Sequence, residues 1–222
     1  SMGRGILDAG RWAEEHEAPP TPPRPKRRLT VPDVFPSWTI NRWFCQAFNT
    51  VWYWKHWQAS RAGVVHPESF FYPLDMLSRW NRIYGRRGFT QYQCVLPTEA
   101  GPEAPVRFLE LLTRLGGASF LCVIKDCGPQ GQGMLSFPRK GVTIAVDLRI
   151  TDGTQALVDR LNELLIEEGG RVYLAKDQFT RREHFEAMEP RIAAFQEVRR
   201  RWDPEHRLRS AQSVRLFGDP AP

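Results

Sequence analysis

The sequence predicts an α+β fold in which an antiparallel β-sheet carries two helices on one face. Between residues 89 and 174, short runs with strand character alternate with longer runs of helical periodicity, in the order strand, helix, strand, strand, helix, strand. Gly169 and Gly170 close the second helix directly before the last strand, as is common at a helix C-terminus. This order is that of the ferredoxin-like, or split βαβ, arrangement.

Each element of this arrangement has its own local signal. The third strand alternates apolar and other residues from Val142 to Ile150. The second helix carries leucines on one face, with Asp152 as a plausible N-cap. The expected strands are residues 89–96, 119–126, 142–150 and 171–174, and the expected helices are residues 106–115 and 155–168.

The remaining segments complete the predicted architecture. Residues 1–37 hold seven prolines among charged residues, which predicts an extended arm or linker. Residues 39–57 carry aromatic residues at helical spacing, so we expect a long amphipathic helix that packs on a core or faces a domain absent from the chain. Further helices are expected at residues 74–84 and 190–201.

Composition narrows the function classes. The net charge of +6 comes largely from basic runs at residues 24–28 and 199–201. Such runs usually form a solvated face, although a nucleic acid or a small acidic or phosphorylated ligand also fits. The four cysteines form no CxxC pair and have apolar neighbours, which indicates buried, reduced thiols in a cytoplasmic protein.

Several kinds of site and segment are not expected. The chain has no apolar run of about 18 residues and no hydrophobic signal region, so no transmembrane segment is predicted. The five histidines lack metal-ligand spacing, so no metal site is expected. No GxGxxG or Walker motif offers a phosphate cradle.

Strand alternation predicts which side chains the sheet displays away from its helices. If Val142 and its alternating neighbours face the helices, then Thr143, Ala145 and Asp147 face the other way. Gln91 and Gln93 likewise share one face of the first strand, where two amides with few obvious local partners could recognise hydroxyl groups. That face is a candidate active site, unless the first or the last helix covers it.

Two lysines are candidates for chemistry near this face. Lys125 ends the second expected strand and Lys176 follows the fourth, so both could lie near one edge of the sheet. The alternative is that each is a surface charge at a strand end. Asp177 could pair with Lys176 or could cap the helix expected near Thr180.

The order and spacing of several motifs resemble a known family. The stretches INRWFCQAFNTVWYW, QYQCVLP, SFLCVIKDCG and GGRVYLAKDQF lie within a region from about residue 38 to residue 212 that resembles the C-terminal half of FAD-linked oxidases of the vanillyl-alcohol oxidase type. The resemblance implies that residues 38–222 form a cap, or substrate-binding, domain over the flavin ring. It also implies hydride transfer from an alcohol carbon to FAD, which turns a sugar-like or polyol carbinol into a ketone.

The resemblance also suggests roles for individual residues. Lys176 matches the essential lysine of the family, with Tyr173 as its neighbour, so both are expected to be catalytic and close to the cofactor. Gln91, Gln93 and Lys125 match substrate-binding positions. The pattern of one family member has asparagine and cysteine where this chain has Thr143 and Ala145, which implies a smaller, less polar wall of the substrate pocket.

The resemblance leaves the flavin to another part of the enzyme, because the 222 residues contain no flavin-binding domain. Ser1 and Met2 look like the remnant of a cloning site, so we expect either an N-terminal FAD-binding domain that was removed or a separate flavoprotein subunit. The chain alone is expected to be inactive.

Two other classes remain open from the sequence. A basic ferredoxin-like sheet could be a nucleic-acid-binding module, although the expected free face shows glutamines rather than aromatic platforms and no RNP-like motif occurs. The chain could also be a non-catalytic interaction module that keeps the cap fold. The family resemblance favours an oxidoreductase with a small hydroxylated substrate and no nucleic-acid partner.

Overall fold

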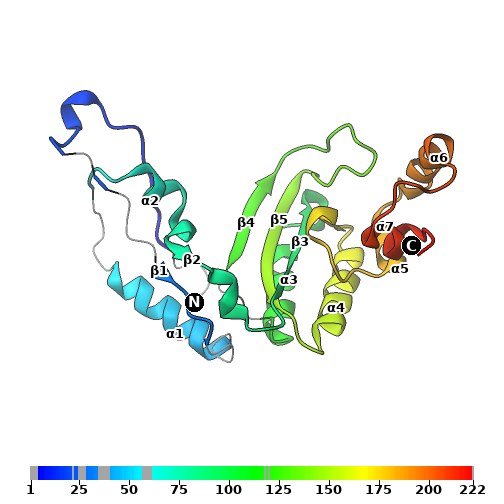
Figure 1. Ribbon diagram of the computed structural model, residues 1–222, viewed down its shortest axis with the longest axis horizontal. Coiled ribbons are helices and arrows are strands. Elements are labelled where there is room, and N and C mark those ends of the chain that lie inside the picture. The colour runs from blue at the N-terminus through cyan, green and yellow to red at the C-terminus, as the bar shows by residue number, and fades with distance from the viewer. Residues whose placement is uncertain are drawn as a thin grey trace. The chain divides into compact units, whose positions relative to one another are not determined.

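The computed structural model describes residues 5–21, 23–24, 29–34, 41–56, 62–117, 119 and 121–221 (Figure 1). The chain divides into two compact units, residues 1–86 and residues 87–222. None of the helices in these described ranges is both long and apolar enough to cross a membrane.

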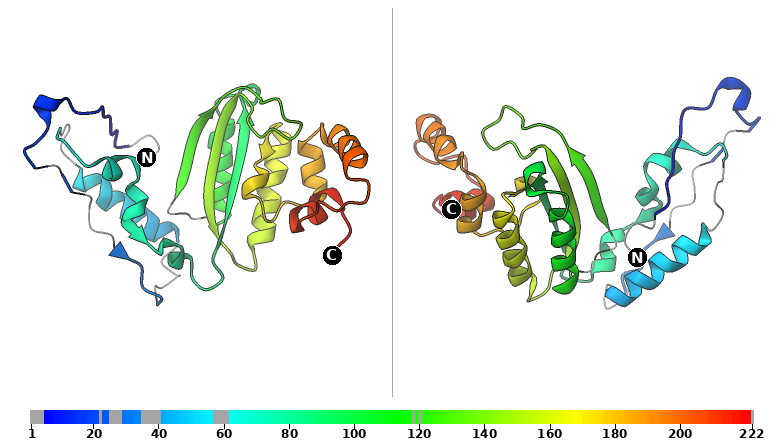
Figure 2. Two further views of the ribbon diagram at one scale, coloured as in Figure 1. Left: turned by 45° about the horizontal axis from the view of Figure 1, so that its top comes forward. Right: turned by 180° about the vertical axis from the view of Figure 1, so that it is seen from behind.

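The second unit is built on a four-stranded antiparallel sheet. Its strands lie in the order β4-β5-β3-β6, and every neighbouring pair is antiparallel. Two helices, α3 and α4, cover one face of the sheet (Figures 1 and 2). The bounds are β3 (Phe89–Pro97), α3 (Ala104–Arg114), β4 (Cys122–Cys127), β5 (Gly141–Arg149), α4 (Thr154–Glu167) and β6 (Arg171–Val172). The predicted ferredoxin-like fold is therefore confirmed.

The core lies between this sheet and its two helices. Alternate residues of β3 and β5 point into it, and Phe108 of α3 and Leu161 of α4 are fully buried against them. Burying a side chain of this size contributes roughly 1.5–3 kcal/mol, so these alternate positions fix which face of each strand turns inward. The sheet residues of the core are Tyr92, Cys94, Leu96, Ile144, Val146, Leu148 and Val172.

The two consecutive glycines after α4 allow β6 to join the sheet. Gly169 adopts a left-handed conformation with φ of 66°, which a side chain would strain. A Cβ atom on Gly170 would lie 2.6 Å from the carbonyl oxygen of Val95 on β3. The chain therefore turns sharply and passes close to β3 because neither residue has a side chain.

Some sequence-based expectations for this unit are wrong. Asp152 does not cap α4: the N-cap is Gly153, and Asp152 instead pairs with Arg87 at 2.6 Å. The apolar strand β4 lies at the sheet edge, where Ile124 is 55% exposed. Cys122 on the same strand is also exposed, contrary to the expectation of buried thiols, although all four cysteines are free as expected.

The first unit contains the aromatic helix α1 (Arg42–Lys55). Its N-cap is Asn41, whose side chain accepts a hydrogen bond from the amide of Phe44. Trp43 and Trp54 of this helix are 73% and 64% exposed, so the expected packing of the stripe on a core is not observed for these residues. The ends of the predicted helix, at residues 39–40 and 57, lie outside the described residues.

The other described residues of this unit form short elements. Strand β1 (Leu29–Thr30) pairs in parallel with β2 (Leu77–Ser78), so the proline-rich arm forms part of a small sheet. The helix expected at residues 74–84 is not continuous, because β2 and a left-handed Arg79, with φ of 57°, separate two short 3-10 helices. The short helix α2 (Pro67–Phe71) precedes them, while residues 25–28 and 35–40 lie outside the described ranges.

Three helices follow the sheet: α5 (Arg182–Met188), α6 (Ile192–Trp202) and α7 (Ala211–Phe217). The predicted end of α6 at Asp203 is confirmed, whereas α7 was not expected. A buried carboxylate, Asp219, fixes the end of this region. Its two oxygens accept hydrogen bonds from Arg199 at 2.9 and 2.8 Å, and one of them lies 3.0 Å from His206 Nδ1.

Replacing Asp219 with Asn should destabilise the α6–α7 region by about 2 kcal/mol, because the largely buried guanidinium of Arg199 would lose its nearest charged partner and keep only Asp203 at 3.8 Å. Its hydrogen bond with Arg199 holds the pKa of the Asp219 carboxyl well below its usual range. The stabilisation should therefore be complete above the ordinary carboxyl pKa of about 4 and decline as the pH falls below it. Amide hydrogen exchange in α7 measures both effects.

The matched control is Glu205→Gln, which removes a carboxylate from an exposed ion pair with Arg207. It should leave α7 exchange unchanged, since exposed pairs contribute little. Equal protection of α7 in Asp219→Asn and in the unmodified chain would contradict the proposed role of Asp219.

Candidate functional site

The sheet face opposite α3 and α4 brings together most of the residues expected to form a site. The antiparallel register places Gln91 beside Asp147 and Gln93 beside Ala145. In the next row, Lys125 of β4 lies beside Thr143 of β5. Side chains at paired positions point to the same face, so these residues share one surface, as the alternation predicted.

Tyr173 extends this surface past the end of β6. Its amide donates a 2.8 Å hydrogen bond to the carbonyl of Gln93, which continues the pairing of β6 with β3 by one residue. Its ring lies against Phe137 from the loop between β4 and β5, with ring centroids 4.6 Å apart. The tyrosine is therefore held between a strand end and a loop.

The two glutamines have neighbours that fix the orientation of their amides. Gln91 Nε2 donates to Asp147 Oδ1 at 2.8 Å, and Gln93 Nε2 donates to Thr143 Oγ1 at 3.1 Å. Thr143 in turn donates its hydroxyl hydrogen to the carbonyl of Cys94 at 2.8 Å, so its oxygen is left to accept from Gln93.

The expectation of few local partners is therefore wrong for the amide nitrogens of Gln91 and Gln93. Among the described residues, no donor reaches either Oε1 atom. The amide nitrogens donate to the Asp147 carboxylate and the Thr143 hydroxyl, so the two Oε1 atoms remain available to accept hydrogen bonds. A ligand with hydroxyl donors is the chemical match for them.

The two lysines do not lie at the same edge of the sheet. Lys125 is in the middle of β4 at one edge, and Lys176 follows β6 at the other. Three strand spacings separate the two edges, or about 14 Å. A small ligand beside Lys176 would therefore be out of reach of Lys125.

Lys176 lies in a single 3-10 turn, Leu174–Lys176, directly after Tyr173. It is partly buried, and within the described part of the chain its ammonium group forms no hydrogen bond or ion pair. Asp177 is not its partner. The Asp177 carboxylate accepts from Arg215 at 2.8 Å and from the amide of Thr180 at 2.9 Å, so it stabilises the turn that leads into α5.

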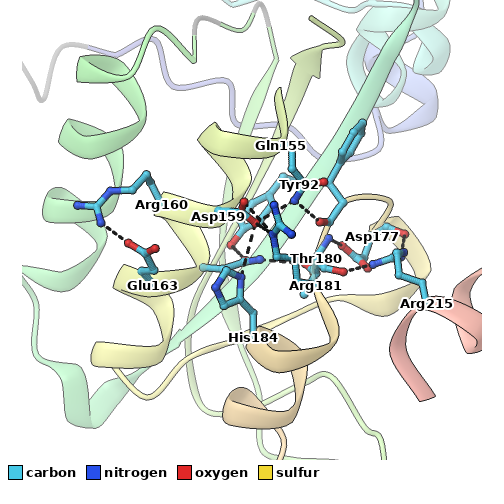
Figure 3. Close-up of polar contacts among 12 residues, drawn as sticks. Tyr92, Gln155, Asp159, Arg160, Glu163, Asp177, Thr180, Arg181, His184 and Arg215 are labelled. Carbon is cyan, nitrogen blue, oxygen red and sulfur yellow. Dashed lines mark hydrogen bonds and ion pairs between the residues drawn. The ribbon is translucent and has the colours of Figure 1, made fainter. Parts of the chain in front are cut away.

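A polar network fastens this turn to the rest of the unit (Figure 3). The hydroxyl of buried Tyr92 donates to Asn162 on α4 at 2.8 Å, and Asn162 donates to Thr180 at 3.2 Å. From α7, Arg215 binds Asp177 and the carbonyl of Thr180, and Gln212 donates to the carbonyl of Leu174 at 2.6 Å. Burial raises the pKa of Tyr92 well above its usual value, so this hydroxyl stays a donor.

Sequence reasoning missed Asn162, Gln212 and Arg215. Asn162 is an amide on the buried side of a leucine-rich helix, and such a residue is usually hydrogen-bonded to a distant partner. That signal was available, but nothing local indicates that Arg215 reaches back 38 residues to Asp177.

Other site types find no support in the described ranges. No group of three His, Cys, Asp or Glu side chains is arranged to hold a metal ion. Burial raises the pKa of the Cys94 thiol, which disfavours a reactive thiolate there. His184 lies in α5, 3.8 Å from Asp159, and thus within the helical layer rather than on the sheet face.

Replacing Arg215 with Met should loosen the Lys176 turn, because Asp177 and the carbonyl of Thr180 would lose their donor. Loss of a charged hydrogen bond of this kind corresponds to roughly tenfold faster local opening or more. Hydrogen exchange of the amides from Leu174 to Thr180 measures the change.

The control is Arg160→Met, which removes an arginine paired with Glu163 on the exposed side of α4 (Figure 3). Exchange in the Lys176 turn should be the same as in the unmodified chain. If Arg215→Met also left that exchange unaltered, the turn would not depend on α7.

Comparison with known proteins places this site in context. No protein-family model matches the chain. The chain is 38% identical over 221 residues to decaprenylphosphoryl-beta-D-ribose oxidase of Mycolicibacterium smegmatis. This match covers 97% of this chain and 48% of that protein. It is 30% identical over 200 residues to an uncharacterized protein in the mprA 5′ region of Streptomyces coelicolor, covering 89% of this chain and 53% of that protein.

The chain thus spans about half the length of the curated relatives it matches. The first relative is an oxidase, and its match extends over nearly the whole of this chain. The resemblance expected from the sequence motifs is thereby confirmed. The chain is related to decaprenylphosphoryl-beta-D-ribose oxidase, and the match is consistent with a C-terminal domain of an FAD-linked oxidase.

Proposed function

We propose that this chain is the substrate-binding cap domain of an FAD-dependent oxidoreductase that oxidises an alcohol to a ketone. The observation that carries the proposal is the shared sheet face, where the acceptor oxygens of Gln91 and Gln93 lie on the same surface as Tyr173. The turn that follows Tyr173 carries Lys176, whose ammonium group has no partner among the described residues. The relationship to an oxidase supports the redox class.

The flavin would be held mainly by an N-terminal FAD-binding domain or by a separate flavoprotein subunit. Of this chain's residues, Lys176 and Tyr173 are the ones that would lie against it: one offers a positive charge and the other an aromatic face. When bound, FAD supplies the acceptor for the hydride that leaves the alcohol carbon.

The glutamines would orient the substrate in this proposal. Each Oε1 atom accepts a hydroxyl hydrogen, and the neighbouring Asp147 and Thr143 prevent the amides from rotating. A small hydroxylated molecule bound in this way keeps one carbinol in a fixed position, which is the main requirement for hydride transfer. Lys125, on the far edge, would contact only the distal part of a longer substrate.

Lys176 fits two roles. As a neutral amine it would take the hydroxyl proton while the hydride departs, and as an ammonium it would stabilise negative charge on the reduced cofactor. Both roles need a lysine without a competing carboxylate. Asp177, the adjacent carboxylate, does not compete for Lys176 because it is paired with Arg215.

In the flavin-containing protein, Lys176→Ala should abolish reduction of the flavin by substrate while the flavin stays bound. Anaerobic stopped-flow absorbance of the flavin measures the rate of its reduction. The first alcohol to test is decaprenylphosphoryl-β-D-ribose, the compound in the name of the relative. We expect a loss of about a thousandfold or more, as for removal of a general base or a charge-stabilising group.

The control for this experiment is Lys140→Ala, because Lys140 is an exposed lysine before β5. It should reduce the flavin at the normal rate. Normal reduction in Lys176→Ala would remove Lys176 from the mechanism, and a flavin bound stoichiometrically by the 222-residue chain alone would contradict the need for another domain.

A second prediction concerns the wall formed by Thr143 and Ala145. The double variant Thr143→Asn, Ala145→Cys restores the residue types of the family pattern and fills the wall. If the wall sets specificity, kcat/KM for decaprenylphosphoryl-β-D-ribose should rise by roughly tenfold, which is typical of a small volume change in a pocket. An equal or lower kcat/KM would mean that these positions do not select the substrate.

A further inference from the structure

A second candidate site lies at β6, the edge strand of the sheet, and its lining includes neither glutamine. A cavity of about 120 Å³ opens there between three segments: the loop between β4 and β5, the end of β6, and α5. Most of its wall is apolar, with Leu135, Phe137 and Phe185 among the lining side chains. Its charged lining residues are Arg171 and Glu189.

Arg171 is a buried cation whose hydrogen bonds are incomplete. The residue is only 7% exposed. Its Nη1 atom donates to the carbonyl of Ser136 at 3.0 Å and to Gln130 Oε1 at 3.2 Å. Its Nε–H group is buried and has no acceptor, although a buried donor of this kind normally has a partner.

Glu189 compensates Arg171 only in part, because another arginine already engages it. Both carboxylate oxygens of Glu189 accept hydrogen bonds from Arg191, at 2.6 and 2.5 Å. The nearest approach of Arg171 to the same carboxylate is 3.7 Å. Two guanidinium groups therefore share one carboxylate, so the three charged groups together, of which Arg171 and Glu189 line the cavity, carry one net positive charge.

The charges around Arg171 support this picture. Burial lowers the pKa of Arg171, and the nearby Arg191 and Arg139 lower it further, whereas Glu189 raises it. Leaving a guanidinium buried with excess positive charge nearby is costly, and an anion in the cavity would remove that cost.

We propose that this cavity binds a small monocarboxylate with a short apolar tail. The carboxylate faces the guanidinium of Arg171, and the tail lies against Leu135, Phe137 and Phe185. A phosphate fits less well, because the apolar wall offers no donors for its remaining oxygens and Glu189 would repel its second charge. Cavities of about 150 Å³ hold six-carbon rings, so a ligand of about six non-hydrogen atoms fits here.

This site does not depend on the proposed oxidation. The cavity meets the sheet face at Arg171, which pairs with Val95 of β3, and at Tyr173, whose ring also contacts Phe137, but it contains neither glutamine nor Lys176. Its test therefore needs neither flavin nor turnover and uses the 222-residue chain as it is.

The experiment is a titration of the chain with sodium butyrate, followed by NMR at constant ionic strength. The signals to follow are the Arg171 Nε–H and the methyl groups of Val172 and Leu174, which line the cavity. We expect saturable shifts with a dissociation constant on the order of 1–10 mM, which is typical of so small a ligand. Butyramide, the neutral analogue, and inorganic phosphate should not shift these signals.

Two variants test the assignment. Arg171→Lys keeps the charge but lacks the planar guanidinium that can bind a carboxylate through two donors, and it should weaken butyrate binding about tenfold or more. Leu135→Trp fills the cavity while keeping Arg171, and it should abolish binding even if Arg171→Lys fails to fold. Arg160→Lys, an exposed control on α4, should bind butyrate like the unmodified chain.

Four results would overturn the proposal. Absence of shifts with butyrate would exclude a carboxylate site, and equal shifts with butyramide would indicate an apolar cavity only. Saturation of the same signals by phosphate would indicate a general anion site without selectivity for an apolar tail. Undiminished binding in Leu135→Trp would place butyrate elsewhere.

Discussion

The pairing of β3 with β5 is the constraint on which the rest of the second unit depends. Their nine paired positions alternate between a face buried under α3 and α4 and a face that carries Gln91, Gln93, Thr143 and Ala145. A slip of one residue would turn the polar set into the core and expose the apolar set. The free energy of burying the core therefore also determines which side chains the candidate site displays.

The Lys176 turn depends on a different kind of interaction. Strand β6 has only two residues, so backbone pairing alone holds little of the chain beyond it. Polar side chains from α4 and α7 supply what the short strand lacks, and Asp177 lies at the centre of them with its side chain 4% exposed. The same contacts keep Asp177 away from Lys176, so a structural requirement also leaves a lysine without a competing carboxylate.

Local sequence patterns were sufficient for the parts of the fold that local physics determines. The alternation in β5, the leucine face of α4 and the two glycines after it led to correct elements and to a correct assignment of which side chains face away from the helices. The network around Asp177 was not accessible in this way, because Tyr92, Asn162 and Arg215 approach it from separate elements. The position of Lys125 was misjudged because a strand's sequence does not state its place in the sheet order.

Thr143 shows why the departures from the family pattern concern more than volume. Its hydroxyl donates to the carbonyl of Cys94 and accepts from Gln93, and it thereby sets which atom of Gln93 faces a ligand. An asparagine there could make a similar pair of bonds through its amide, but its longer side chain would move Gln93 relative to β3. The wall and the hydroxyl-binding group are therefore coupled. A substitution of Thr143 would affect substrate binding through the orientation of Gln93 as well as through the volume of the pocket.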